Sequence, residues 1–243
     1  MRPHDRRPHD KRSSVRRWAA PLLATAAMTL GACVPSTLAP YTSGPTPDAP
    51  RLGAWGDSIL EESRTQIEGS LADTWSVSTT ASPGATLTQL TVRAQEYMFS
   101  APSAEVVVAG TNDVHEIDGP WGTLDHLRDQ SMVLESTRDV PCLVWVNVDE
   151  SMPPRSAGAE PGPHAADFNT ALRLWAARHP HLRIVDWNAA LLFLGRDHLI
   201  ALDGVHPSDE GRQVLANLVR YVLDNDCPPE AKVWRDPPRF GWR

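Results

Sequence analysis

The 243-residue sequence has few cysteines, no glycine period and no excess of basic residues. Its three cysteines are too few for a disulfide scaffold, and its fifteen glycines exclude collagen and give no sign of a repeat array. A formal net charge of −7 argues against a nucleic-acid binder with a basic face. Hydrophobic residues make up 41% of the chain, enough for a real core. The length then suits one domain with extensions, or at most two small domains.

The charges are distributed unevenly along the chain. Residues 1–17 hold seven Lys/Arg against two acids, and no further charged residue occurs before Asp48. From Cys33 onward, 16 basic residues stand against 28 acidic ones, a balance of −12. The prediction that the protein binds no nucleic acid is therefore firmer for this part than for the whole sequence.

The N-terminus has the pattern of a secretory signal over residues 1–32. A basic start is followed by the apolar run Trp18–Leu30, which is short for a bilayer-spanning helix, and then by small residues. The run leads into Leu-Gly-Ala-Cys33, which resembles the bacterial lipobox, whose cysteine becomes the lipid-modified first residue of the mature protein. We therefore expect an exported protein, anchored in the cell membrane by lipid on Cys33 and facing the extracellular or periplasmic side. A plain cleaved signal is the alternative, and Arg16-Arg17 leaves a twin-arginine route open.

The rest of the chain divides into a tether, a domain and a tail. Residues 33–50 are rich in Pro, Ser, Thr and Ala, which predicts a flexible tether. We expect the folded domain over residues 51–226 and a tail with prolines and tryptophans over 227–243. Export places Cys142 and Cys227 in an oxidising compartment, where they can pair. Whether they are close enough, or remain separate thiols, is left open by the sequence.

Apolar strand-like runs alternate with helix-length segments in the predicted domain. The expected strands are Leu52–Trp55, Trp75–Thr79, Glu105–Ala109, Cys142–Val148 and Leu182–Val185. The expected helices cover residues 59–71, 85–98, 123–137, 165–178 and 208–224. This alternation predicts an α/β fold, with a parallel sheet covered by helices on both faces. The Pro/Gly-rich segment 149–163 is expected to be a loop bordering a site.

Reactive or small residues follow four of these elements. They are Gly56-Asp57-Ser58, the segment around Gly84, Gly110-Thr111-Asn112-Asp113, and Asp203-Gly204-Val205-His206-Pro207. Ligands of open parallel sheets bind beyond the carboxyl ends of the strands. We therefore expect the four segments to meet at one site.

The residue types in these segments suit acyl-transfer chemistry. Ser58, at a helix N-terminus, would be the nucleophile, and His206 would be its base. Asp203, three residues earlier, would hold the other imidazole nitrogen and stabilise the imidazolium. The oxyanion donors would be the backbone N–H groups of Ser58 and Gly84 and the side-chain amide of Asn112.

In this order, the four segments resemble the four blocks of the SGNH (GDSL-type) hydrolases, over roughly residues 51–225. The resemblance implies a three-layer α/β/α flavodoxin-like sandwich with a five-stranded parallel sheet, and ester chemistry without a metal or other cofactor. Only Gly84 and its small neighbours carry the second block. The Gly-x-Ser-x-Gly elbow of the α/β-hydrolases is absent. Val185-Asp186-Trp187 also resembles SGNH domains fused to membrane acyltransferases, which modify cell-surface sugars.

We therefore expect a serine esterase that hydrolyses acyl or acetyl esters of glycans or lipids at the cell envelope, through an acyl-enzyme. Its partners would be the ester substrate and the membrane, and the protein would be a monomer. Two alternatives remain. One is an O-acyltransferase that moves an acyl group to a cell-surface sugar hydroxyl, and the other is a non-catalytic glycan-binding module.

Several neighbouring residues have a structural and a functional interpretation. Asp57 is expected to hold loops by hydrogen bonds. The group His115, Glu116 and Asp118 lacks the spacing of a known metal site and predicts a solvated loop. The tryptophans that could line a sugar or acyl cleft are Trp55, Trp121, Trp145 and Trp187. Trp121 is the best cleft candidate, whereas core packing is favoured for Trp145.

Overall fold

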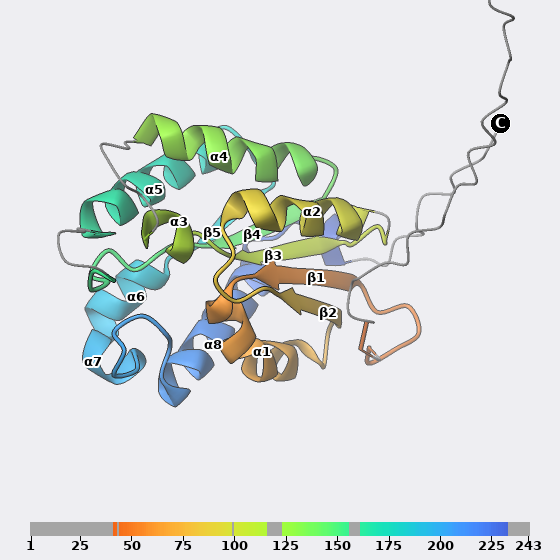
Figure 1. Ribbon diagram of the computed structural model, residues 1–243. Helices are drawn as coiled ribbons and strands as arrows, with labels where there is room; N and C mark the ends of the chain where they lie inside the picture. The colour runs from red at the N-terminus through yellow and green to blue at the C-terminus, as the bar shows by residue number, and fades with distance from the viewer. Residues whose placement is uncertain (1–40, 43, 99, 116–122, 156–160, 233–243) are drawn as a thin grey trace, which may run out of the picture. The chain divides into compact units, whose positions relative to one another are not determined.

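The computed structural model describes residues 41–42, 44–98, 100–115, 123–155 and 161–232. Five parallel strands form one sheet in the order β2-β1-β3-β4-β5 (Figure 1). The strands are β1 (Arg51–Gly56), β2 (Ser76–Ala81), β3 (Ala104–Val108), β4 (Cys142–Val146) and β5 (Leu182–Val185). The helices are α1 (Ser58–Leu71), α2 (Leu87–Met98), α3 (Thr111–His115), α4 (Thr123–Ser136), α5 (Pro161–Ala176), α6 (Trp187–Leu194), α7 (Arg196–Leu199), α8 (Asp209–Asn225) and the 3-10 turn η1 (Pro229–Lys232). No helix in the described part of the chain is long and apolar enough to cross a membrane.

The sheet is covered on both faces, which confirms the predicted three-layer sandwich. Helices α1 and α8 pack on one face, and α2, α4 and α5 pack on the other (Figure 1). Successive strand residues point to opposite faces, so Val106 and Val144 join the first core and Val107 and Trp145 join the second. Helices α3, α6 and α7 lie beyond the carboxyl ends of the strands (Figure 1).

The largest differences from the sequence prediction concern β4, α5 and the segment after β5, and the short helix α3 was not expected either. Strand β4 ends at Val146 instead of Val148, and α5 begins at Pro161, inside the predicted loop 149–163. Proline suits the first turn of a helix, whose N–H groups have no partner in the helix. The segment from Trp187 to Leu199 forms α6 and α7 where no helix was expected. The segment is short and most of its first half is apolar, so it shows no alternation of apolar and polar residues at the helical period.

The tether predicted over residues 33–50 is attached to the domain in its last ten residues. The N–H of Thr42 donates to the Val77 carbonyl at 2.7 Å, and Thr42 Oγ1 accepts from the Val77 N–H at 3.0 Å. The Tyr41 hydroxyl lies 2.7 Å from Ser100 Oγ, and Ala49 is buried. These contacts give partners to the edge strand β2. The fold therefore begins about ten residues earlier than the sequence indicates.

A disulfide joins Cys142, the first residue of β4, to Cys227, which follows α8. The two Cα atoms are 5.6 Å apart. Beyond it, η1 buries Ala231, so the beginning of the predicted tail packs against the domain.

Candidate active site

Ser58 is the first residue of α1, placed there by a sharp strand-to-helix turn. Gly56 ends β1 so close to β3 that a Cβ atom would lie 2.1 Å from the Val108 carbonyl oxygen. Asp57 then caps α1, because its Oδ1 accepts from the Ile59 N–H at 2.9 Å. The turn sets Ser58 at the positive end of the helix dipole, beyond the carboxyl end of β1.

The structure brings Ser58, His206 and Asp203 into one hydrogen-bonded series. Ser58 Oγ lies 2.9 Å from His206 Nε2, and His206 Nδ1 lies 2.7 Å from Asp203 Oδ2. The other Asp203 oxygen accepts from the N–H groups of Val205 and His206, at 2.9 and 3.0 Å. The loop before α8 therefore holds the carboxylate by three contacts, and this carboxylate orients the imidazole toward the serine.

The two aspartates at the site have opposite electrostatic environments. Burial raises the pKa of Asp57 to about 7, although the Ile59 N–H acts against it. At Asp203 slight burial acts in the same upward direction, but the hydrogen bonds from Val205 and His206 outweigh it and lower the pKa to about 2. Asp203 is therefore ionised at neutral pH.

Asn112, in α3, contacts the two turns that carry the other candidate oxyanion donors. The buried Asn112 amide donates through Nδ2 to the Ala85 carbonyl at 3.0 Å and lies 3.5 Å from Asp57 Oδ2. Ala85 follows Gly84, whose φ of +79° suits glycine in this turn. Asn112 therefore links the turn that carries Gly84 to the turn that carries Ser58.

Asp113 joins the segment that follows Gly84 to the segment 110–113. Its two carboxylate oxygens accept from the Leu87 N–H, at the start of α2, at 3.0 and 3.1 Å. Gly110 lets the backbone before α3 pass close to the Phe168 ring. Its φ is +127°, and a Cβ atom there would lie 2.4 Å from that ring.

Three charged residues at the site were not singled out from the sequence. Arg155 Nη2 donates to Asn112 Oδ1 at 2.9 Å, which turns the amide nitrogen toward Ala85. Glu62 Oε1 lies 3.9 Å from His206 Nε2, and Arg196 Nε donates to Asp149 Oδ2 at 2.8 Å. Spacing alone could have indicated Glu62, because it lies one helical turn after Ser58. Arg155 and Arg196 carry no such local signal.

The structure changes the interpretation of Trp55 and of His115. Trp55 and Trp145 are fully buried in the core under α2, α4 and α5, so the cleft interpretation is wrong for Trp55. Trp121 lies outside the described residues, as do Glu116 and Asp118. His115 ends α3 instead of lying in a solvated loop, and burial, with Arg155 nearby, lowers its pKa to about 4. Within the described ranges, no three potential metal ligands gather.

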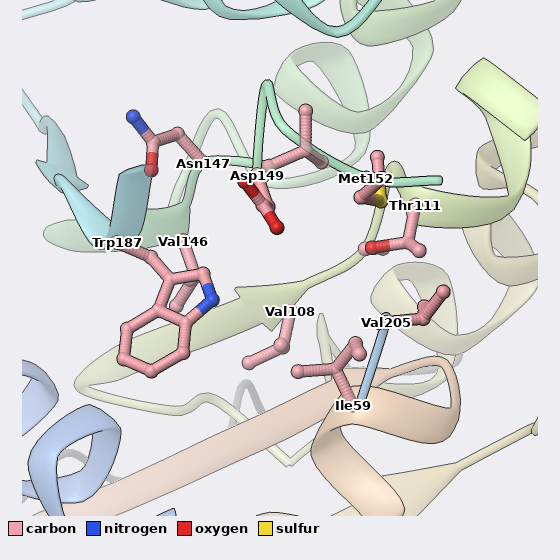
Figure 2. A pocket seen from close by; sticks show the side chains of 11 residues that line it. Ile59, Val108, Thr111, Val146, Asn147, Asp149, Met152, Trp187 and Val205 are labelled. Carbon is pink, nitrogen blue, oxygen red and sulfur yellow. The ribbon is translucent and has the colours of Figure 1, made fainter. Parts of the chain in front are cut away.

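A small cavity lies beside the series, at the carboxyl ends of β3 and β4 (Figure 2). Trp187 forms one wall, and Val108 and Val146 form the floor. Asp186 sets the position of Trp187, because its Oδ1 caps α6 by accepting from the Ala189 N–H at 3.0 Å.

No protein-family model matches the chain, and no curated protein matches it. Solved structures do match, and three of them, at 18–19% identity, follow. A lipase/acylhydrolase from Enterococcus faecalis superposes with a TM-score of 0.60 at 18% identity, over 74% of this chain and 98% of that one. A GDSL-like lipase from Bacteroides thetaiotaomicron gives 0.57 at 18%, over 72% and 87%. The C-terminal catalytic domain of Streptococcus pneumoniae peptidoglycan O-acetyltransferase A gives 0.53 at 19%, over 74% and 97%.

Proposed function

We propose, from the premise that the chain has the fold of the SGNH (GDSL-type) hydrolases, that it is a serine esterase acting on acyl or acetyl esters at the cell envelope. The observation that carries the proposal is the series Ser58–His206–Asp203, with contacts of 2.9 and 2.7 Å, at the N-terminus of α1. A serine hydroxyl needs such a base to attack an ester at neutral pH.

In the proposed reaction, Ser58 Oγ attacks the ester carbonyl carbon while His206 Nε2 takes its proton. The carbonyl oxygen becomes an oxyanion, which the N–H groups of Ser58 and Gly84 would stabilise. The Asn112 amide is the third proposed donor and would have to exchange its bond to the Ala85 carbonyl for one to the oxyanion. His206 then protonates the leaving alcohol, and an acyl group remains on Ser58. Water attacks this acyl-enzyme with His206 again as the base, which releases the acid and restores the serine. Asp203 stabilises the imidazolium in both halves.

The first test is hydrolysis of p-nitrophenyl acetate by the purified protein. Ser58→Ala should lower kcat/KM by about 10³-fold or more, because it removes the nucleophile. Ser70→Ala is the matched control, since Ser70 lies on the same helix and its hydroxyl donates to the Ile67 carbonyl within that helix. A sulfonyl fluoride should label the wild type on Ser58 and leave Ser58→Ala unlabelled. Full activity of Ser58→Ala would contradict the mechanism.

An O-acyltransferase is the second candidate. The similarity to a peptidoglycan O-acetyltransferase domain and the segment Val185-Asp186-Trp187 favour it, because Trp187 lines the cavity beside the series. The same series would then pass the acyl group to a sugar hydroxyl in place of water. Acylated glycan formed in excess of free acid would establish transfer. Glycan retention without ester turnover, equal in Ser58→Ala, would instead indicate a binding module.

We further propose that the protein is an exported monomer anchored by lipid on Cys33. The lipobox-like sequence supports the anchor, and the Cys142–Cys227 disulfide suits an oxidising compartment. Mass spectrometry of the mature N-terminus tests the anchor. Cys33→Ala should release the protein from the membrane fraction, and its retention there would contradict the proposal.

A further inference from the structure

We infer that the site accepts only very short acyl groups, with acetyl as the preferred one, because the hollow beside Ser58 has room for little more than a methyl group. The inference rests on the proposed function and specifies its substrate. It depends on where the cavity lies, how large it is and how firmly its walls are held.

The cavity is lined by sequence neighbours of three residues of the proposed machinery. Ile59 follows Ser58, Thr111 precedes Asn112 and Val205 precedes His206, and all three of these neighbours line it (Figure 2). An acyl group carried on Ser58 Oγ, with its carbonyl oxygen toward Asn112, would therefore have this hollow within reach of its alkyl end.

The cavity is small, and most of the side chains that line it are apolar. Its volume is about 20 Å³, close to the 10–15 Å³ that a single water needs. The floor consists of Val108 and Val146, which belong to central strands and are 2% and 3% exposed. Close-packed strand side chains do not move aside for a longer chain.

The remaining walls are held by hydrogen bonds between loops. Asn147 Nδ2 donates to Asp186 Oδ1 at 2.8 Å, and Asn147 Oδ1 accepts from the Asn188 N–H at 3.0 Å. These bonds fix the start of α6, and with it Trp187. On the other side, Asp149 accepts from the Ser151 N–H at 2.8 Å, which shapes the loop that carries Met152.

Arg196 does not line the cavity but links two of the loops that do. It donates through Nε to Asp149 and through Nη2 to the Gly204 carbonyl, so it joins the Met152 loop to the loop that carries Val205. The walls are thus cross-linked by polar contacts, and a longer acyl chain would have to displace Met152 or Trp187.

The test is a series of p-nitrophenyl acetate, butyrate and octanoate with the purified protein. Each methylene in a fitted pocket changes kcat/KM by roughly 10–200-fold, so we expect acetate to exceed butyrate, which has two more methylenes, by about a hundredfold or more. Octanoate should be the poorest substrate. Met152→Ala enlarges the cavity and should raise the butyrate-to-acetate ratio by about tenfold. Trp187→Leu is a second enlargement from another wall.

Val77→Ala is the matched control, because it truncates a buried side chain in β2 away from the cavity and should leave the butyrate-to-acetate ratio unchanged. Butyrate or octanoate turned over as fast as acetate by the wild type would overturn the inference and leave the esterase proposal intact. Enlarged variants with the wild-type ratio would also overturn it. Absence of turnover on all three esters, with Ser58 unlabelled by a sulfonyl fluoride, would instead overturn the proposed function itself.

Discussion

At the scale of single residues, burial decides what a carboxyl group does. Asp203 is held ionised by hydrogen bonds, whereas Glu105 lies fully buried in β3 beneath the helices. Its Oε2 accepts from the Trp55 indole N–H at 2.8 Å, and its Oε1 has no hydrogen-bond partner among the described residues. Burial raises the pKa of Glu105 from 4.5 to about 8, so the folded protein keeps this carboxyl protonated at neutral pH.

Glu105→Gln should remove a pH dependence of stability. Between pH 4.5 and about 8 the native Glu105 holds a proton that the unfolded chain has released, so the free energy of unfolding falls as pH rises. The loss is on the order of 5 kcal/mol across this window. Gln keeps an acceptor for Trp55 and does not titrate. Urea unfolding at pH 5 and pH 8 should show a smaller decrease for the variant, and an equal decrease would contradict the assignment.

Arg155 and Asn112 should affect turnover unequally. Asn112→Ala removes a proposed oxyanion donor, and such a loss lowers kcat by roughly 10²–10³-fold. Arg155→Ala leaves the amide in place and removes only the contact that orients it, so its loss of kcat should be several times smaller. Arg155→Lys should recover part of the activity. A larger loss in Arg155→Ala than in Asn112→Ala would show that Arg155 has a more direct role.

At the scale of elements, α6 shows why a continuous apolar run is ambiguous. Leu191 is 1% exposed and belongs to the core, whereas the next residues, Leu192 and Phe193, are 69% and 88% exposed. The helix is fixed at its start by the Asp186 cap and ends at Gly195, whose φ is +97°. Asp186 is thus a structural residue that also holds the cavity wall.

Two alanine substitutions in α6 should differ sharply in their effect on the free energy of unfolding. Leu191→Ala leaves a void in the core and should cost about 2–5 kcal/mol. Phe193→Ala removes a solvent-exposed ring and should change stability by less than about 0.5 kcal/mol. Chemical denaturation measures both. Equal losses would mean that the exposed face of α6 is covered by something in solution.

At the scale of the whole molecule, the two ends of the sheet carry different tasks. The proposed site lies beyond the carboxyl ends, where Ser58, Asn112 and His206 meet. The amino ends carry the attachment of residues 41–50, through Thr42 and β2, and the disulfide at Cys142. With lipid on Cys33, seven residues lie between the anchor and Tyr41, and the eight steps from Cα to Cα reach about 29 Å at most. The proposed site then faces away from the anchored end of the domain.

Removing the disulfide should therefore lower stability without changing the chemistry. The bond spans 85 residues, and its loss should cost about 2–4 kcal/mol, because the unfolded chain becomes less constrained. The double variant Cys142→Ala/Cys227→Ala should unfold at lower urea than the wild type and keep its kcat/KM on p-nitrophenyl acetate at 25 °C. A large loss of kcat/KM in a folded variant would show that the disulfide at the amino ends of the strands affects the proposed site at their carboxyl ends, and would contradict this prediction.

The sequence by itself determined the five strands, the five long helices, the parallel sheet and the four segments of reactive or small residues. These are local properties: apolar runs of strand length, caps, and reactive residues placed directly after buried strands. Only the tertiary structure decided that Thr42 joins the edge of β2, that Cys142 meets Cys227, that Arg155 holds Asn112, and that the hollow beside Ser58 is about 20 Å³. Each of these depends on the distance between residues far apart in the chain. Packing sets that distance, and no local pattern of residues encodes it.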